Sequence, residues 1–196
     1  MKPVTRILGI AALALATACS TAPITQHTSG PNYSVQAPIR LNAVKIEVVS
    51  EYTPRGSAPS IDHMMDRNPQ SALVEWAKGR LRASGTSGYV QVKLKDASVT
   101  SRMLETEGGI SGYFTREQSE ELVARLSVDI SGDQRDENFN GYTTVEASQV
   151  TTVPEKATKA ERTAIENDLV NKLIQQFNDK AESGIVQHLG PMVVQK

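Results

Sequence analysis

The chain has 196 residues and a formal net charge of −1, with 21 basic and 22 acidic side chains spread along it. This balance offers neither a basic stripe for nucleic acid nor an arginine-rich face for anionic lipid headgroups. The only cysteine, Cys19, excludes a disulfide framework and a thiolate metal site. The length suits one ordinary domain.

The first nineteen residues have the order of a secretory signal. Two basic residues precede an apolar run, residues 7–15, which is too short to span a bilayer. The small triplet Ala16-Thr17-Ala18 then leads directly to Cys19. This stretch resembles the lipobox of bacterial lipoproteins, in which a short apolar or small triplet precedes the cysteine. The resemblance implies cleavage after residue 18 and acylation of Cys19 with diacylglycerol and a further chain such as palmitate.

The residue after the cysteine bears on the expected membrane. In the lipoproteins that this stretch resembles, Asp at this position favours the inner membrane, whereas Ser permits export to the outer membrane, and here it is Ser20. We therefore expect a protein anchored in the outer membrane through Cys19 and facing the periplasm. The alternative is a plain secretory signal that leaves a free periplasmic thiol.

Residues 20–38 are rich in Ser, Thr, Pro and Gly and contain few apolar groups. Such a composition cannot bury enough surface to offset the entropy lost on ordering. We therefore expect a signal peptide over residues 1–18, a lipidated cysteine with a flexible tether over 19–38, and a single domain over 39–196.

The first half of that domain predicts a strand, a loop and a helix. Apolar and polar residues alternate over residues 39–52, which is typical of a strand with one buried face. A polar loop follows to residue 68, where Asn68-Pro69 predicts a helix start. This helix should bury Trp76 in the core and end near Gly85.

The second half predicts three strands and a long helix. The same alternation marks strands over residues 89–99, 122–131 and 142–153, with turn formers between residues 132 and 141. From residue 154 to 189 apolar residues recur about every four positions, which predicts an amphipathic helix. Thr158 and Glu161 have the spacing of a capping box near its start.

This order of elements predicts an α+β two-layer sandwich, with about four mainly antiparallel strands and two helices on one face. The order is similar to that of the lipopolysaccharide-assembly lipoprotein family and of auxiliary lipoproteins of lipid ABC transporters. The similarity lies in element order alone, and no motif of these families is matched residue by residue. It implies an accessory role in the envelope.

Two loops carry apolar side chains that a plain connection does not need. Between the second and third predicted strands, Ile110, Tyr113 and Phe114 lie among glycines. Met64 and Met65 lie in the loop before the first helix, and methionine adapts to irregular partner surfaces. We expect these residues to bind a partner. Alternatively, the first group folds back onto the core and the second loop packs on the sheet edge.

Motifs of enzymatic chemistry are not matched. Residues 85–88 and 109–112 each place a serine beside glycines, but not at the spacing of a nucleophile elbow. The three histidines are scattered, and the acidic residues lack metal-ligand spacing. We therefore expect no catalytic residue, metal or cofactor, and a non-enzymatic accessory protein that docks on an outer-membrane assembly or lipid-transport complex. The alternative is a periplasmic carrier of an apolar ligand or lipid.

Overall fold

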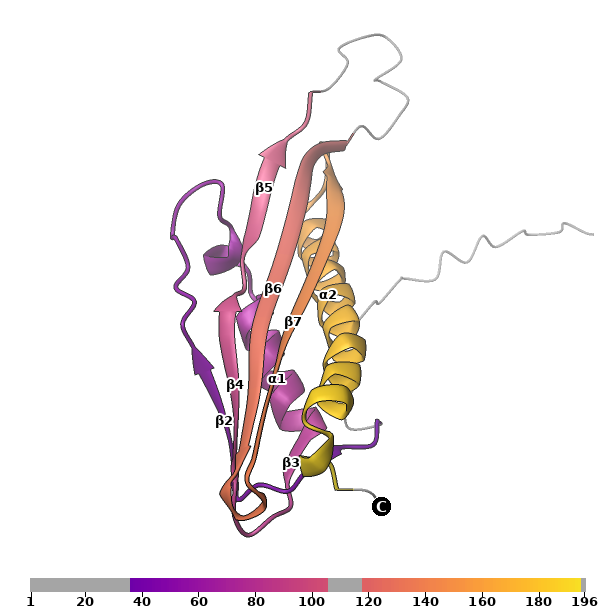
Figure 1. The fold of residues 1–196 in the computed structure, drawn as a ribbon. Coiled ribbons are helices and arrows are strands. Elements are labelled where there is room, and N and C mark those ends of the chain that lie inside the picture. The colour runs from indigo at the N-terminus through magenta and orange to yellow at the C-terminus, as the bar shows by residue number, and fades with distance from the viewer. Residues whose placement is uncertain (1–35, 106–117, 195–196) are drawn as a thin grey trace, which may run out of the picture.

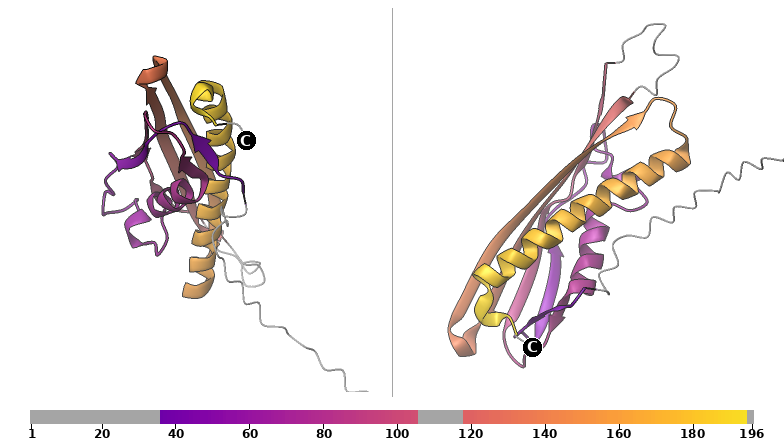
Figure 2. Two further views of the ribbon diagram at one scale, coloured as in Figure 1. Left: turned by 90° about the horizontal axis from the view of Figure 1, so that it is seen from below. Right: turned by 90° about the vertical axis from the view of Figure 1, so that its right-hand side faces the viewer.

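The computed structural model describes residues 36–105 and 118–194, which form one body of two layers (Figure 1). One layer is a mixed sheet of five strands, and the other consists of two helices. Figure 2 shows that both helices cover the same face of the sheet, with the longer one running along it. The predicted α+β two-layer sandwich is confirmed.

The sheet is organised around one long central strand. Its members are β2 (Lys45–Ser50), β4 (Tyr89–Asp96), β5 (Val99–Met103), β6 (Gln118–Gln134) and β7 (Phe139–Pro154). Strand β2 pairs with β4 in parallel, and helix α1 (Pro69–Arg80) forms the crossover between them. Strands β4 and β5 both pair antiparallel with one side of β6, and β7 pairs antiparallel with its other side. The sheet is therefore antiparallel except at its first strand.

The strand predicted over residues 89–99 is divided in two. The pairing register with β6 shifts between Leu94 and Asp96. The Asp96 carboxylate then accepts a hydrogen bond from the Ser98 backbone N–H at 3.0 Å, and β5 begins at the next residue. Because β5 pairs with a different part of β6, the sheet has five strands where about four were predicted.

The segment predicted as a turn between residues 132 and 141 belongs mostly to the strands. The turn itself is a short 3-10 segment, Arg135–Glu137, followed by Asn138 in the left-handed region at φ 49°. Gly132 and Gly141 lie opposite each other in the ladder. A side chain at either glycine would collide with residues 188–192. These glycines therefore permit close packing of the C-terminal residues.

Helix α1 begins as predicted and ends earlier. The Asn68 side chain accepts a hydrogen bond from the Ser71 N–H at 2.9 Å, and the Ser71 hydroxyl accepts one from the Asn68 N–H at 3.2 Å. The helix stops at Arg80, because the chain continues directly into a strand, β3 (Leu81–Ala83), before it reaches Gly85. Tertiary pairing rather than glycine therefore ends this helix.

A second, two-stranded sheet lies at one end of the body. Strand β1 (Ile39–Leu41) pairs in parallel with β3, so the strand predicted over residues 39–52 is divided into β1 and β2. On its other side, β1 contacts the C-terminal residues: Leu41 bridges to Val193, and the Arg40 carbonyl accepts from the Val194 N–H at 2.9 Å. The first strand is thus held from both sides.

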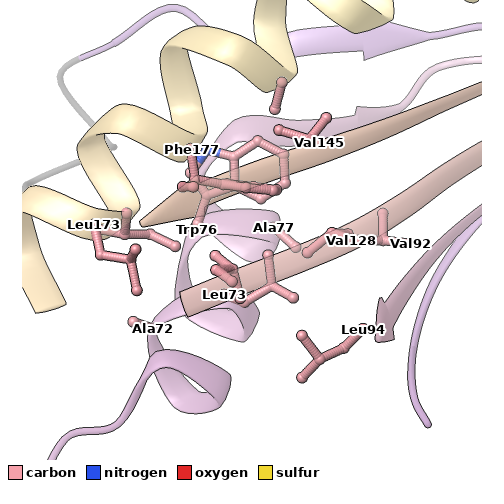
Figure 3. Packing of buried hydrophobic residues seen from close by; sticks show 14 of the residues in the cluster. Ala72, Leu73, Trp76, Ala77, Val92, Leu94, Val128, Val145, Leu173 and Phe177 are labelled. Carbon is pink, nitrogen blue, oxygen red and sulfur yellow. The ribbon is translucent and has the colours of Figure 1, made fainter. Parts of the chain in front are cut away.

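Helix α2 (Lys159–His188) begins at the predicted capping box, in which the Thr158 hydroxyl accepts from the Glu161 N–H at 3.2 Å. It continues through Gly184. The Phe177 ring meets Trp76 edge-on, with ring centroids 4.8 Å apart, so the predicted burial of Trp76 is confirmed (Figure 3). The helix and sheet residues that fill this core are Leu169, Leu173, Ile174, Ala181, Val90, Val92, Leu94, Leu122, Leu126, Val128 and Ile130.

Candidate functional site

The predicted partner-binding loop lies outside the described residues. Ile110, Tyr113 and Phe114 belong to residues 106–117, and Cys19 belongs to residues 1–35. The end of β5 and the start of β6, which flank residues 106–117, lie at the end of the sheet away from β1 (Figure 1). Strand β6 contains 17 residues, which corresponds to a length of roughly 55 Å at the rise of a strand. The described residues that flank these two segments therefore lie at opposite ends of the body.

The two predicted methionines have different environments. Met64 is 67% exposed, whereas Met65 is 8% exposed and belongs to the core together with Ile61. The short 3-10 segment Asp62–Met64 turns the chain between them. This loop therefore offers a partner only Met64, and the burial of Met65 agrees with the alternative that the loop packs against the body.

A buried carboxylate fixes this loop. Asp62 is 1% exposed and accepts hydrogen bonds from the Ser60 hydroxyl and, at 3.0 Å, from the Tyr52 hydroxyl. Burial, followed by the hydrogen bond to Asp62, raises the pKa of Tyr52 to about 12. The sequence predicted only a polar loop here, because no local pattern indicates that Tyr52 contacts Asp62.

A buried arginine marks the place where the chain joins the body. Arg80 is 2% exposed, and its guanidinium donates to the Ala37 carbonyl, to Asn178 Oδ1 at 2.9 Å and to Glu182 Oε2 at 2.6 Å. Trp76 Nε1 donates to the same Asn178 oxygen at 2.9 Å. The network joins α1 and α2 and fixes the chain two residues before β1. Nothing in the local sequence distinguishes Arg80 from an exposed basic residue at a helix end.

The open face of the sheet is polar. Asp129 on β6 accepts from the Thr144 hydroxyl on β7 at 2.9 Å. At the β2 side, Glu51 forms ion pairs with Lys93 and Lys95. Such a face is typical of an antiparallel sheet that is solvated on one side. Within the described strands, Tyr142 and Val150 of β7 are the large apolar or aromatic side chains exposed on this face, and the polar residues Thr144, Glu146 and Ser148 separate them along the strand.

The free edge of β7 is covered by side chains of α2. Gln176 Oε1 accepts from the Ser148 N–H at 3.1 Å, and Lys180 Nζ donates to the Glu146 carbonyl at 2.8 Å. An edge strand with unpaired backbone groups invites pairing with another chain. These two side chains occupy the middle of that edge.

Two surface hollows accompany these features. One, of about 410 Å³, is lined by Arg55 and Arg125 together with hydroxyl side chains such as Thr53 and Thr100, and Asp96 also lines it. The other, of about 840 Å³, is an open groove between α2 and β7.

The space between the helices and the sheet is filled by side chains. Trp76, Leu73 and Phe177 occupy it with no exposed surface (Figure 3). A bound lipid there would have to displace this core. Within residues 36–105 and 118–194, no cluster of three or more His, Cys, Asp or Glu side chains could hold a metal, and no helix could span a bilayer.

Comparison with protein-family models and with curated protein sequences gives no match. Among solved structures, the chain is similar to a minor lipoprotein from Acinetobacter baumannii, with 12% identity over 72% of this chain and 94% of that one, at a TM-score of 0.35. It is also similar to the rare lipoprotein B from Shewanella oneidensis, with 8% identity over 70% and 91% of the two chains, at a TM-score of 0.33. At these scores the similarity carries no argument.

Proposed function

We propose that this chain is a non-enzymatic, lipid-anchored accessory protein of the bacterial cell envelope. In this proposal acyl chains on Cys19 hold it in the outer membrane, it faces the periplasm, and it docks on an outer-membrane assembly or lipid-transport complex. One observation carries the proposal: the described chain enters β1 at one end of the body, whereas β5 ends and β6 begins at the opposite end (Figure 1).

The anchor follows from the lipobox-like sequence. Two or more acyl chains attach a protein stably, since each buried methylene contributes about 0.8 kcal/mol. Residues 20–38, taken as the flexible tether that their composition predicts, have an average span of roughly 25 Å. The Arg80 contact to Ala37 then connects this tether to a fixed point on the body.

The far end is the docking surface in this proposal. Met103, the last residue of β5, is 73% exposed, and the next residues in sequence lead to Ile110, Tyr113 and Phe114. Aromatic and methionine side chains are favoured at the centres of protein interfaces. The polar open face of the sheet is a weaker candidate, because its charged groups would lose water on docking.

The anchor is tested by labelling cells with a clickable palmitate analogue and separating the membranes. We expect the native chain to take up label and to fractionate with the outer membrane, and the Cys19→Ala variant to take up none. A native chain without label would refute the lipid anchor.

The docking surface is tested by placing a photo-crosslinking amino acid at Met103. The control position is Val186, which is also exposed but lies near the opposite end of the body on α2. We expect a reproducible envelope protein to be crosslinked from position 103 and not from 186. Identical products at both positions would contradict docking through the far end, even if Cys19 is acylated.

A further inference from the structure

Three basic residues lie at the end of the body where the described chain enters β1. Arg40 on β1 and Arg82 on β3 are partners in the parallel register, so they project from the same face of this small sheet. Lys78 belongs to the last turn of α1, four residues before Arg82. All three are exposed. We call these residues the tether-end cluster.

The positive charges of the cluster repel each other, and no ion pair within the described residues neutralises them. Like charges on neighbouring strands repel each other. Among the described residues, no carboxylate lies within ion-pair distance of Arg40, Lys78 or Arg82. The Arg82 guanidinium donates to the Lys78 and Leu81 carbonyls at the end of α1, which uses only part of its donors.

Two carboxylates at this end of the molecule have other partners. Glu182 binds Arg80 at 2.6 Å, and Glu137 accepts from the Asn42 amide at 3.0 Å. The positive charge of the cluster is therefore available to a negatively charged surface outside the body.

We propose that the tether-end cluster docks the body on anionic phospholipid headgroups. This proposal rests on the proposed anchor at Cys19, which would place a bilayer within reach of this end. Arg40 is the second residue of the first strand, so the tether leaves the body beside the cluster. A basic side chain close to an anionic membrane strengthens binding about fivefold. The body is then oriented with its β1 end toward the membrane and with the end of β5 at Met103 directed away from it.

The chain offers two natural probes for a test. Cys19 is its only cysteine and Trp76 its only tryptophan, and Trp76 lies two residues before Lys78 on α1. A chain of residues 19–196 keeps every described helix and strand. Its Cys19 thiol can be coupled to a maleimide lipid in vesicles, without acylation in cells. Energy transfer from Trp76 to a dansyl-labelled lipid then measures how close the body lies to the surface.

We expect more energy transfer on vesicles of phosphatidylethanolamine and phosphatidylglycerol than on phosphatidylcholine alone. The excess should fall as salt is added, since the charges are exposed. Replacing Arg40→Gln and Lys78→Gln together should lower the ratio of docked to undocked body on the order of 25-fold. Arg82 is left in place because it also binds the end of α1.

The matched control removes the same two charges elsewhere, with Arg55→Gln and Arg125→Gln at the hollow on the open face. This pair should leave the transfer unchanged. Equal transfer on both kinds of vesicle, or equal losses in both variants, would overturn the proposal. If circular dichroism shows that the Arg40→Gln and Lys78→Gln variant is unfolded, the salt dependence of the native chain tests the proposal instead. Excess transfer on the anionic vesicles that does not fall with salt would then overturn it. Because coupling is chemical, these results stand whether or not cells acylate Cys19.

Discussion

Asn178 offers a sharp test of the network that joins the helices. Its side-chain oxygen accepts from both Trp76 Nε1 and Arg80 Nε, each at 2.9 Å, and all three residues are buried. The Asn178→Ala variant leaves two buried donors without this acceptor, and one of them is charged. A buried donor left unsatisfied costs about 1–3 kcal/mol. We therefore expect the free energy of unfolding to fall by about 2–5 kcal/mol.

The measurement is urea unfolding followed by circular dichroism, with Trp76 fluorescence as a second signal. Asn171→Ala is the matched control on the same helix, because Asn171 accepts from Arg67 at 2.7 Å. Arg67 keeps its ion pair with Glu75 at 3.0 Å, so this loss should stay below about 1 kcal/mol. If Asn178→Ala costs no more than Asn171→Ala, the network does not stabilise the body as we argue.

Two further predictions concern the edge of the sheet and alkaline stability. The double variant Gln176→Ala and Lys180→Ala should expose the backbone of the β7 edge, and light scattering should then show self-association that increases with protein concentration. A variant that stays monomeric would show that these two side chains do not protect the edge. The raised pKa of Tyr52 means that the folded body favours the neutral phenol, so its stability is fully present below pH 10 and decreases as the pH rises to about 12. Tyr52→Phe should remove this part of the alkaline decrease in urea midpoints, and an unchanged pH profile would contradict the assignment.

Much of the secondary structure could be predicted because its causes are local. Alternation of apolar residues in β4 and β6 and the four-residue spacing in α2 place the core side chains correctly. Both helix starts were predictable, since Asn68 and Thr158 cap backbone groups within three residues of themselves.

The errors occur where distant segments meet. Helix α1 ends at Arg80 because β3 pairs with β1, about forty residues earlier in the chain. Gly132 and Gly141 suggested turns, but they accommodate the C-terminal residues inside a continuous ladder. Met65 looked equivalent to Met64, and only the packing of the loop separates a core residue from an exposed one.

The sequence by itself predicts a lipobox-like leader ending at Cys19, and it determined the α+β class and most strand and helix positions, because each depends on neighbouring residues or on a short period. The tertiary structure decided which side chains far apart in the chain meet. In the near-neutral sequence, Arg40 and Arg82 are isolated single charges. From the charge balance of the sequence alone, we expected no basic face. They become neighbours because β1 pairs with β3. A charge pattern in three dimensions follows from strand register, and register depends on contacts that no local stretch contains.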